Sequence, residues 1–176
     1  MDIMQPAPTT FRGIVEADLR RAARAIIKVQ DELDFQFRIA TPQGDYAIAV
    51  TMPNDPHERS AMLRRVGTFM AWRQALAFSL AVELVEPDAV YCVGISARAR
   101  HHCQSRITRT PKPWTKANFG PVEWLPESAI DPALAELLPV QPRPLTPKEV
   151  AAADKWFGTK GKFPAIHIAT GEVRGL

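Results

Sequence analysis

A nearly continuous apolar run in the middle of the chain, Ala89–Ala97, places the strongest constraint on the fold. The run is short, is rich in β-branched residues and follows Pro87 and Asp88, which favour a turn. Such a run between turn residues is typical of a central strand that is covered on both faces. Cys103–Thr110 alternates between polar and apolar residues. We therefore expect these two segments to form a hairpin with its turn in 97–101.

A second hairpin is predicted nearer the start of the chain. Asp34–Ala40 and Tyr46–Met52 both alternate, and Thr41–Asp45 between them has the composition of a turn. Pro121–Leu125 is a candidate for one further short strand.

Four segments have helical patterns. Val15–Leu33 carries apolar residues at helical spacing, with arginines on its opposite side. Asp55, followed by a proline and a glutamate, is a strong helix start, and we expect that long helix to continue to about Leu84. Its second half, Ala75–Val82, is apolar all round and should lie within the core. Shorter helices are predicted over Asp131–Leu138 and from Thr146 to about Phe157.

Partly segregated strands and helices favour an α+β fold. We expect an antiparallel or mixed sheet of about 4–5 strands from two hairpins, a long helix on one face and small C-terminal helices. The domain prediction is a single α+β domain over 1–138 with a loose start at 1–10, a Pro-rich linker over 139–147, and a C-terminal helix and tail over 148–176. The linker prediction rests on the prolines, 16 in the chain, which cluster late in the sequence.

The composition is that of a globular protein, with 46% hydrophobic and 23% charged residues. Two cysteines, Cys92 and Cys103, do not form a disulfide framework. Neither a signal peptide nor a membrane-spanning segment is visible in the sequence. We therefore expect a cytoplasmic protein with no membrane partner.

Charge is distributed unevenly along the chain. Between Asp88 and Glu123 there is no acidic residue, although the whole chain carries a net charge of only +3. A concentrated basic segment can hold a polyanion, because cations neutralise phosphates and aromatic rings stack on bases. The candidate nucleic-acid-binding residues at the hairpin tip and exit loop, 98–116, are Arg98, Arg100, His101, Arg106, Arg109, Lys112, Trp114 and Lys116.

The predicted function is therefore that of a small non-enzymatic binding module, which contacts nucleic acid or another polyanion. Four alternatives stay open. The basic segment could pack on an acidic protein surface, or could only confer solubility. The chain could be an interaction protein or homo-oligomer subunit that uses the hairpin at 34–52 or segment 139–147. An enzyme would need His57, Glu58, His101 and Cys103 to converge in a pocket.

No motif predicts a metal, a cofactor or a catalytic group. His101 and His102 are adjacent on a predicted strand and would point to opposite faces, so one ion could not easily bind both. Gly158–Lys162 lacks the spacing of a phosphate loop, since Phe163 follows its last lysine. Gly94–Ala97 lacks the second glycine of a nucleophile elbow.

Overall fold

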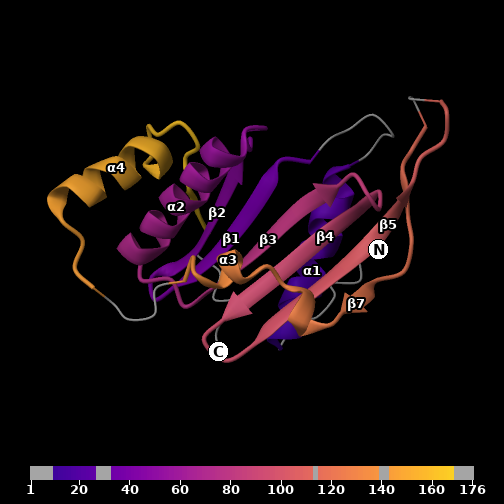
Figure 1. Ribbon diagram of the computed structural model, residues 1–176, viewed down its shortest axis with the longest axis horizontal. Helices are drawn as coiled ribbons and strands as arrows, with labels where there is room; N and C mark the ends of the chain where they lie inside the picture. The colour runs from indigo at the N-terminus through magenta and orange to yellow at the C-terminus, as the bar shows by residue number, and fades with distance from the viewer. Residues whose placement is uncertain (1–9, 27–32, 113–114, 139–142, 169–176) are drawn as a thin grey trace.

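An antiparallel sheet runs through the whole molecule, with helices on both of its faces (Figure 1). The computed structural model describes residues 10–26, 33–112, 115–138 and 143–168. Its eight strands have the order β6-β5-β4-β3-β1-β2-β8, and β7 also pairs with β5. The strands are β1 (Phe35–Thr41), β2 (Gly44–Val50), β3 (Ala77–Leu84), β4 (Ala89–Ser96), β5 (Arg100–Thr108), β6 (Asn118–Phe119), β7 (Glu123–Leu125) and β8 (Ile166–Ile168).

The helices divide between the two faces of the sheet. They are α1 (Phe11–Ala25), α2 (Pro56–Trp72), α3 (Pro132–Ala135) and α4 (Pro147–Phe157), with a 3-10 turn η1 at Glu127–Ala129. α1 packs against β3, β4 and β5 on one face, and α4 packs against α2 on the other. In Figure 1, α1 lies behind the sheet and α3 in front of it.

Two apolar cores follow from this arrangement. On the α2 side, Phe37 and Ile48 of the first hairpin pack with Val66 and Phe69 of α2. On the α1 side, Val15 and the rest of the apolar stripe of α1 pack with β4 and β5. The strand β4 is buried along nearly its whole length, which confirms the predicted central strand covered on both faces. The fold is α+β, as predicted.

The two predicted hairpins are confirmed. In the first, Phe35 pairs with Val50 and Thr41 pairs with Gly44, so the loop has two residues. Gly44 has a φ of 118°, which favours glycine at that turn. In the second, β4 pairs with β5. Both helix caps are also confirmed: Asp55 accepts a hydrogen bond from the Glu58 backbone at the start of α2, and α4 begins with a complete capping box.

The predicted long helix to Leu84 is wrong, because α2 ends at Trp72. Gln74 has a φ of 55°. Its N–H donates to Ala71 and the next N–H, that of Ala75, donates to Met70, which is the Schellman end of a helix. Ala75–Val82, predicted as the buried half of that helix, instead leads into and forms most of β3, whose first six residues are all buried. A strand buried on both faces and a buried helix give the same unbroken apolar pattern.

The sheet also has more strands than the 4–5 predicted. The additional strands are β3, the short β6 beside β5, and β8, which pairs with β2, whereas β7 lies within the predicted short strand Pro121–Leu125. The predicted tail, for which no strand is expected from the sequence, therefore contributes a strand to the sheet. Residues 1–9, 139–142 and 169–176, which include most of the predicted loose start and part of the predicted linker, lie outside the described residues.

Candidate functional site: a cationic surface and a buried charge cluster

The tip of the β4–β5 hairpin is a tight turn. Ser96 holds it, because its Oγ accepts hydrogen bonds from the backbone N–H groups of Arg98 and Ala99, at 3.2 and 3.0 Å. The Ser96 N–H also donates to the Ala99 carbonyl at 2.9 Å. Both Arg98 and Arg100 are exposed at this tip. The two cations are thus presented to solvent from an ordered loop.

The cations after β5 have different surroundings. Arg109 donates to Asp88 at 2.8 Å and also contacts Glu83. The hydrogen bond to Asp88 and the charge of Glu83 raise the pKa of the Arg109 guanidinium. Arg109 is therefore engaged in ion pairs that join β5 to the β3–β4 turn.

The other candidates of the basic segment are more exposed. Arg106 lies 3.8 Å from Glu123, in an ion pair between largely exposed side chains, where such a pair contributes little. Lys112 and Lys116 are exposed, and Trp114 lies outside the described residues.

The predicted binding residues do not form one patch. β5 has nine residues, so its ends are roughly 27 Å apart at about 3.4 Å per residue. Arg98 and Arg100 lie at one end of this strand, and Lys112 and Lys116 follow its other end (Figure 1). Any single ligand that touches both groups must extend along the whole strand.

A cluster of cations and aromatic rings lies beside the hairpin tip, where α1 begins. The Arg12 guanidinium lies 4.1 Å from the centre of the Trp124 ring. His101 contacts both Trp124 and Phe11, with ring centres 6.3 and 6.1 Å apart. The sequence prediction included His101 but missed Arg12 and Trp124. They belong to α1 and β7, and the pairing of β7 with β5 brings them together.

The outer side of α1 continues this cationic surface. Four arginines, Arg12, Arg20, Arg21 and Arg24, are exposed on α1. Two acidic residues lie among them: Glu16 pairs with Arg20 at 2.7 Å, and the buried Asp18 contacts Arg21. Between α1 and the β6–β7 segment lies a cleft of about 370 Å³, with Arg20 and Arg24 on one wall and Phe119 on the other. We call Arg12, Arg20, Arg24 and Trp124 the α1 cationic surface.

The four groups that an enzyme would need do not converge. His57 and Glu58 are exposed at the start of α2, which packs on the opposite face of the sheet from Cys103. His101 lies in the aromatic cluster beside α1. Within the described ranges, no three histidine, cysteine or acidic side chains gather closely enough to hold a metal ion.

The two cysteines face each other on neighbouring strands. Cys92 pairs with Cys103 in the β4–β5 register. A turn centred on Arg98 and Ala99 predicts instead that Cys92 pairs with about Ser105, two residues further along, and that prediction is wrong. Both are fully buried against α1. Burial raises the pKa of both thiols, that of Cys103 to about 12. Thiols of this kind are poor nucleophiles at neutral pH.

His102 has a structural role on the other face of the sheet. Its Nε2 lies 2.6 Å from the Pro126 carbonyl, and its Nδ1 lies 3.0 Å from the Tyr91 hydroxyl. Because a carbonyl only accepts, Nε2 carries the proton and donates it. His102 thereby fixes the segment after β7 against β5, while His101 points to the opposite face.

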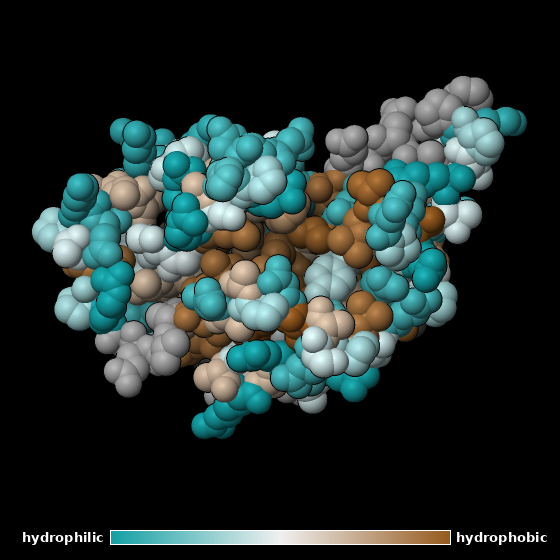
Figure 2. Space-filling model, in the orientation of Figure 1, coloured by the Kyte–Doolittle hydropathy of each residue, from teal (hydrophilic) through white to brown (hydrophobic). Residues whose placement is uncertain are grey.

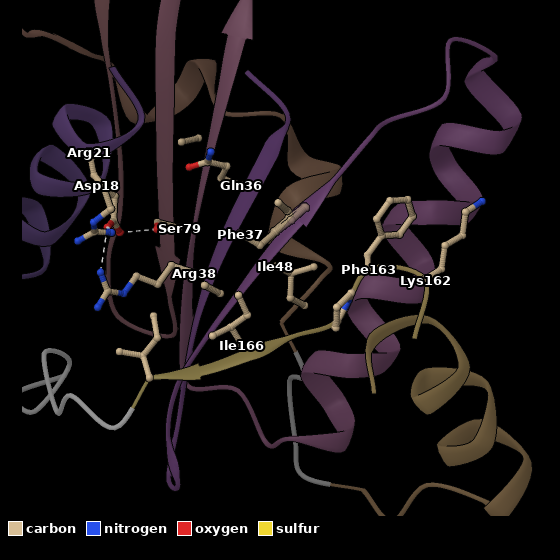
Figure 3. Close-up of a pocket in the computed structure, with 15 residues that line it drawn as sticks. Asp18, Arg21, Gln36, Phe37, Arg38, Ile48, Ser79, Lys162, Phe163 and Ile166 are labelled. Carbon is tan, nitrogen blue, oxygen red and sulfur yellow. Dashed lines mark hydrogen bonds and ion pairs between the residues drawn. The ribbon is translucent and has the colours of Figure 1, made fainter. Parts of the chain in front are cut away.

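A buried charge cluster lies where α1 meets the first hairpin (Figure 3). Asp18 of α1 accepts a hydrogen bond from Ser79 at 2.5 Å, and it contacts Arg21 and Arg38. The Arg38 guanidinium also lies 3.3 Å from Asp45. Asp45, a turn residue in the sequence-based interpretation, is therefore a buried member of β2. The spacing in sequence between these groups gave no signal of their contact.

Comparisons with known protein families, with curated proteins and with solved structures give no match to this chain. Among the helices of the described residues, none combines the length and apolar character needed to span a bilayer.

Proposed function

We propose that this protein is a non-enzymatic binding module for nucleic acid, in which the hairpin tip and exit loop of 98–116 act together with the α1 cationic surface. The observation that carries the proposal is the position of Arg12 over Trp124, 4.1 Å from the ring centre, beside the exposed tip arginines. Cations that neutralise phosphates next to a ring that can stack on a base are the combination that nucleic-acid binding requires.

Charge along α1 supports the same proposal. Its exposed side carries four arginines against one glutamate. Arg12 and Arg24 are twelve residues apart, which is about 18 Å along a helix. The α1 surface thus links the hairpin tip with the other end of β5, near Lys116.

Single-stranded nucleic acid is the class of ligand that we favour. Trp124 is partly exposed at the edge of the sheet, where an unpaired base can reach its ring. Base stacking on aromatic side chains contributes about 1–3 kcal/mol per base and tolerates any sequence. We therefore expect weak sequence preference and strong salt dependence.

The test is a titration of labelled single-stranded RNA and DNA at several salt concentrations. Three variants test the three parts of the proposed binding surface separately: Arg12→Ala/Arg20→Ala/Arg24→Ala on α1, Arg98→Ala/Arg100→Ala at the hairpin tip, and Lys112→Ala/Lys116→Ala on the exit loop. The matched control, Arg64→Ala/Lys148→Ala/Lys155→Ala, removes the same charge as the α1 variant from exposed sites on α2 and α4.

The α1 variant should weaken binding and lower the salt slope by about 2, since each lost phosphate contact on a single strand contributes about 0.7. The control should change the slope by much less. Equal losses in the α1 variant and in the control would show that only net charge matters. Binding of the wild type that is insensitive to salt would refute the proposal.

A second candidate function is that of an interaction protein or homo-oligomer subunit. Figure 2 shows apolar side chains in a hollow over the middle of the sheet. Partly buried members of the α2-side core include Met52, Leu84 and Tyr91, and Val85, which follows Leu84 in the chain, is 86% exposed. The terminal strand β8 also carries the exposed Ile166. A strict monomer in light scattering that captures no protein partner would count against this candidate.

A further inference from the structure

The cleft of about 370 Å³ between α1 and the β6–β7 segment, which we call the α1–β6 cleft, combines an apolar lining with one aromatic wall. Its apolar lining comes from Leu19 and Ala23 of α1 and from Val122, just before β7. The half-buried ring of Phe119 in β6 forms the wall that faces α1. At roughly 30 Å³ for each water-sized group, the cleft holds about twelve non-hydrogen atoms, which is the size of a purine base.

The charge of the cleft comes from Arg24. This residue is exposed in the last turn of α1. Within the part of the chain that the structure describes, Arg24 has neither an ion pair nor a hydrogen bond. Arg20 lies on the same wall but is already paired with Glu16 at 2.7 Å, so that pair adds no net charge. An anionic group that reaches the cleft therefore meets one uncompensated cation beside an apolar lining.

The rings of Phe119 and Trp124 lie in one row beside β5. Phe119 pairs with Ile107 of β5, and Trp124 pairs with Cys103. These two partners are four residues apart, so both rings lie on the same face of the sheet, about 14 Å from each other at about 3.4 Å per residue. Both rings pack against the core on the α1 side, and each has an arginine of α1 beside it. The α1–β6 cleft thus repeats, further along α1, the combination of ring and arginine that is found at Trp124.

We propose that the α1–β6 cleft binds one purine base of a single strand that also reaches Trp124. The cleft serves the single-stranded nucleic-acid binding proposed above, on which this inference rests, and it adds a position at which base identity matters. The base stacks on the Phe119 ring, and Arg24 pairs with a neighbouring phosphate. A purine covers the apolar lining, whereas the smaller pyrimidine leaves part of that lining in water. Removing apolar surface from water is favourable in proportion to its area, so a purine binds more tightly here.

The experiment measures the fluorescence anisotropy of labelled oligo(U) strands titrated with the full chain. One strand contains only uracil, and a second strand of equal length carries a single adenine. Oligo(U) is the host because its bases stack little on one another, so binding does not have to disrupt the strand. We expect the single adenine to strengthen binding to the wild type about 3- to 5-fold, which is a modest preference set by stacking.

Two variants separate the ring from the cation. Phe119→Leu removes the ring and keeps an apolar side chain against the core on the α1 side. It should weaken binding of the adenine strand about 5- to 10-fold and abolish the preference for adenine. Arg24→Gln should weaken both strands by a similar factor, lower the salt slope by about 0.7 and leave the preference unchanged.

Phe163→Leu is the matched control for the ring. Phe163 is also half-buried, and it stacks on Trp156 beside Lys162. It precedes β8, which lies at the opposite edge of the sheet from β6. The control should change neither the affinity for the strands nor the preference for adenine.

Ala23→Met is a second test of the cleft, because it fills the cleft from α1 without removing the ring. It should lower the preference for adenine to less than about 2-fold, and thermal melts without nucleic acid show which variants are folded. An adenine strand that binds the wild type no tighter than oligo(U) would overturn the purine site. A preference that persists in folded Phe119→Leu and Ala23→Met, while binding stays salt-dependent, would also overturn the site and leave the proposed function standing. Wild-type binding that is absent or insensitive to salt would overturn both.

Discussion

Replacing Arg38 with methionine is the sharpest test of the buried charge cluster. Arg38 lies between two carboxylates, 3.5 Å from Asp18 and 3.3 Å from Asp45, and all three side chains are nearly buried, with 11%, 5% and 3% of their surface exposed. Methionine keeps most of the apolar length of arginine and removes the charge. The substitution therefore isolates the loss of the guanidinium group.

The expected loss of unfolding free energy depends on the contacts that the two carboxylates lose when Arg38 is replaced. Both Asp18 and Asp45 lose a contact with the buried guanidinium, and Asp18 retains Ser79 and Arg21. Removing one partner of a buried ion pair costs about 3–5 kcal/mol because a charge stays buried without compensation. With Asp18 still supported, we expect Arg38→Met to lower the free energy of unfolding by about 3 kcal/mol. That is a large part of the 5–15 kcal/mol typical of a domain.

The assay is urea unfolding of four proteins: the wild type, Arg38→Met, Asp45→Asn and the double variant. Neutralising Asp45 should recover about 1 kcal/mol or more in the Arg38→Met background, which is a coupling that a double-mutant cycle measures. Arg20→Met is the matched control, and since its pair with Glu16 is exposed it should cost less than about 1 kcal/mol. A cost for Arg38→Met no larger than that of the control, with no recovery by Asp45→Asn, would refute this account of the cluster.

Three further predictions concern local features. Gln74→Gly should raise the free energy of unfolding by about 0.5–1 kcal/mol in urea melts, because glycine adopts the positive φ of the α2 end without strain; a loss of stability would contradict the assigned helix end. Burial raises the pKa of Cys103 to about 12 and also raises that of Cys92. Thiol labelling at pH 8 should therefore be at least about 100-fold slower in the native protein than in denaturant. Equal labelling rates would show that the thiols are accessible in the native protein. Hydrogen bonds from Arg143 and from Thr146 lower the pKa of Glu149 from 4.5 to about 2, so the stabilising contribution of Glu149 is complete above pH 4.5 and is lost as the pH falls toward 2. The Tm difference between the wild type and Glu149→Gln should therefore shrink over that pH range. A constant Tm difference would argue against the capping box.

Local signals in the sequence were enough for the elements that carry them. The Asp55 and Thr146 caps each place a polar acceptor before a proline, and both helices begin there. The hairpin β1–β2 alternates because one of its faces packs on α2. In each case the chemistry that fixes the structure lies within a few residues of the element itself.

The end of α2 had no such signal. A Schellman end usually contains glycine at its left-handed position, and here that position is Gln74. Without glycine or proline to mark a break, the apolar segment after it extends the helical pattern without interruption. Only the pairing of β3 with β1 and β4, which are distant in sequence, identifies it as a strand.

The candidate sites depended still more on distant contacts. The sequence shows that 98–116 is rich in basic residues, but in the structure β5 separates these residues into two groups at its ends. Arg12 and Trp124, which form the cation–ring contact beside the tip, are more than a hundred residues apart in the chain. The buried charge cluster needs residues from three strands and a helix, and no spacing along the sequence encodes that set.

The packing of α1 on β4 has a consequence for synthesis of the chain. Val15 of α1 lies so close to Gly94 of β4 that even a Cβ on the glycine would come within 2.2 Å of it. α1 leaves the ribosome first, and its partner strand is translated about 80 residues later. At about 5–20 residues per second, the apolar stripe of α1 has no native surface to cover it for roughly 4–16 s. During that interval the nascent chain exposes apolar surface of the kind that makes incomplete chains prone to aggregation.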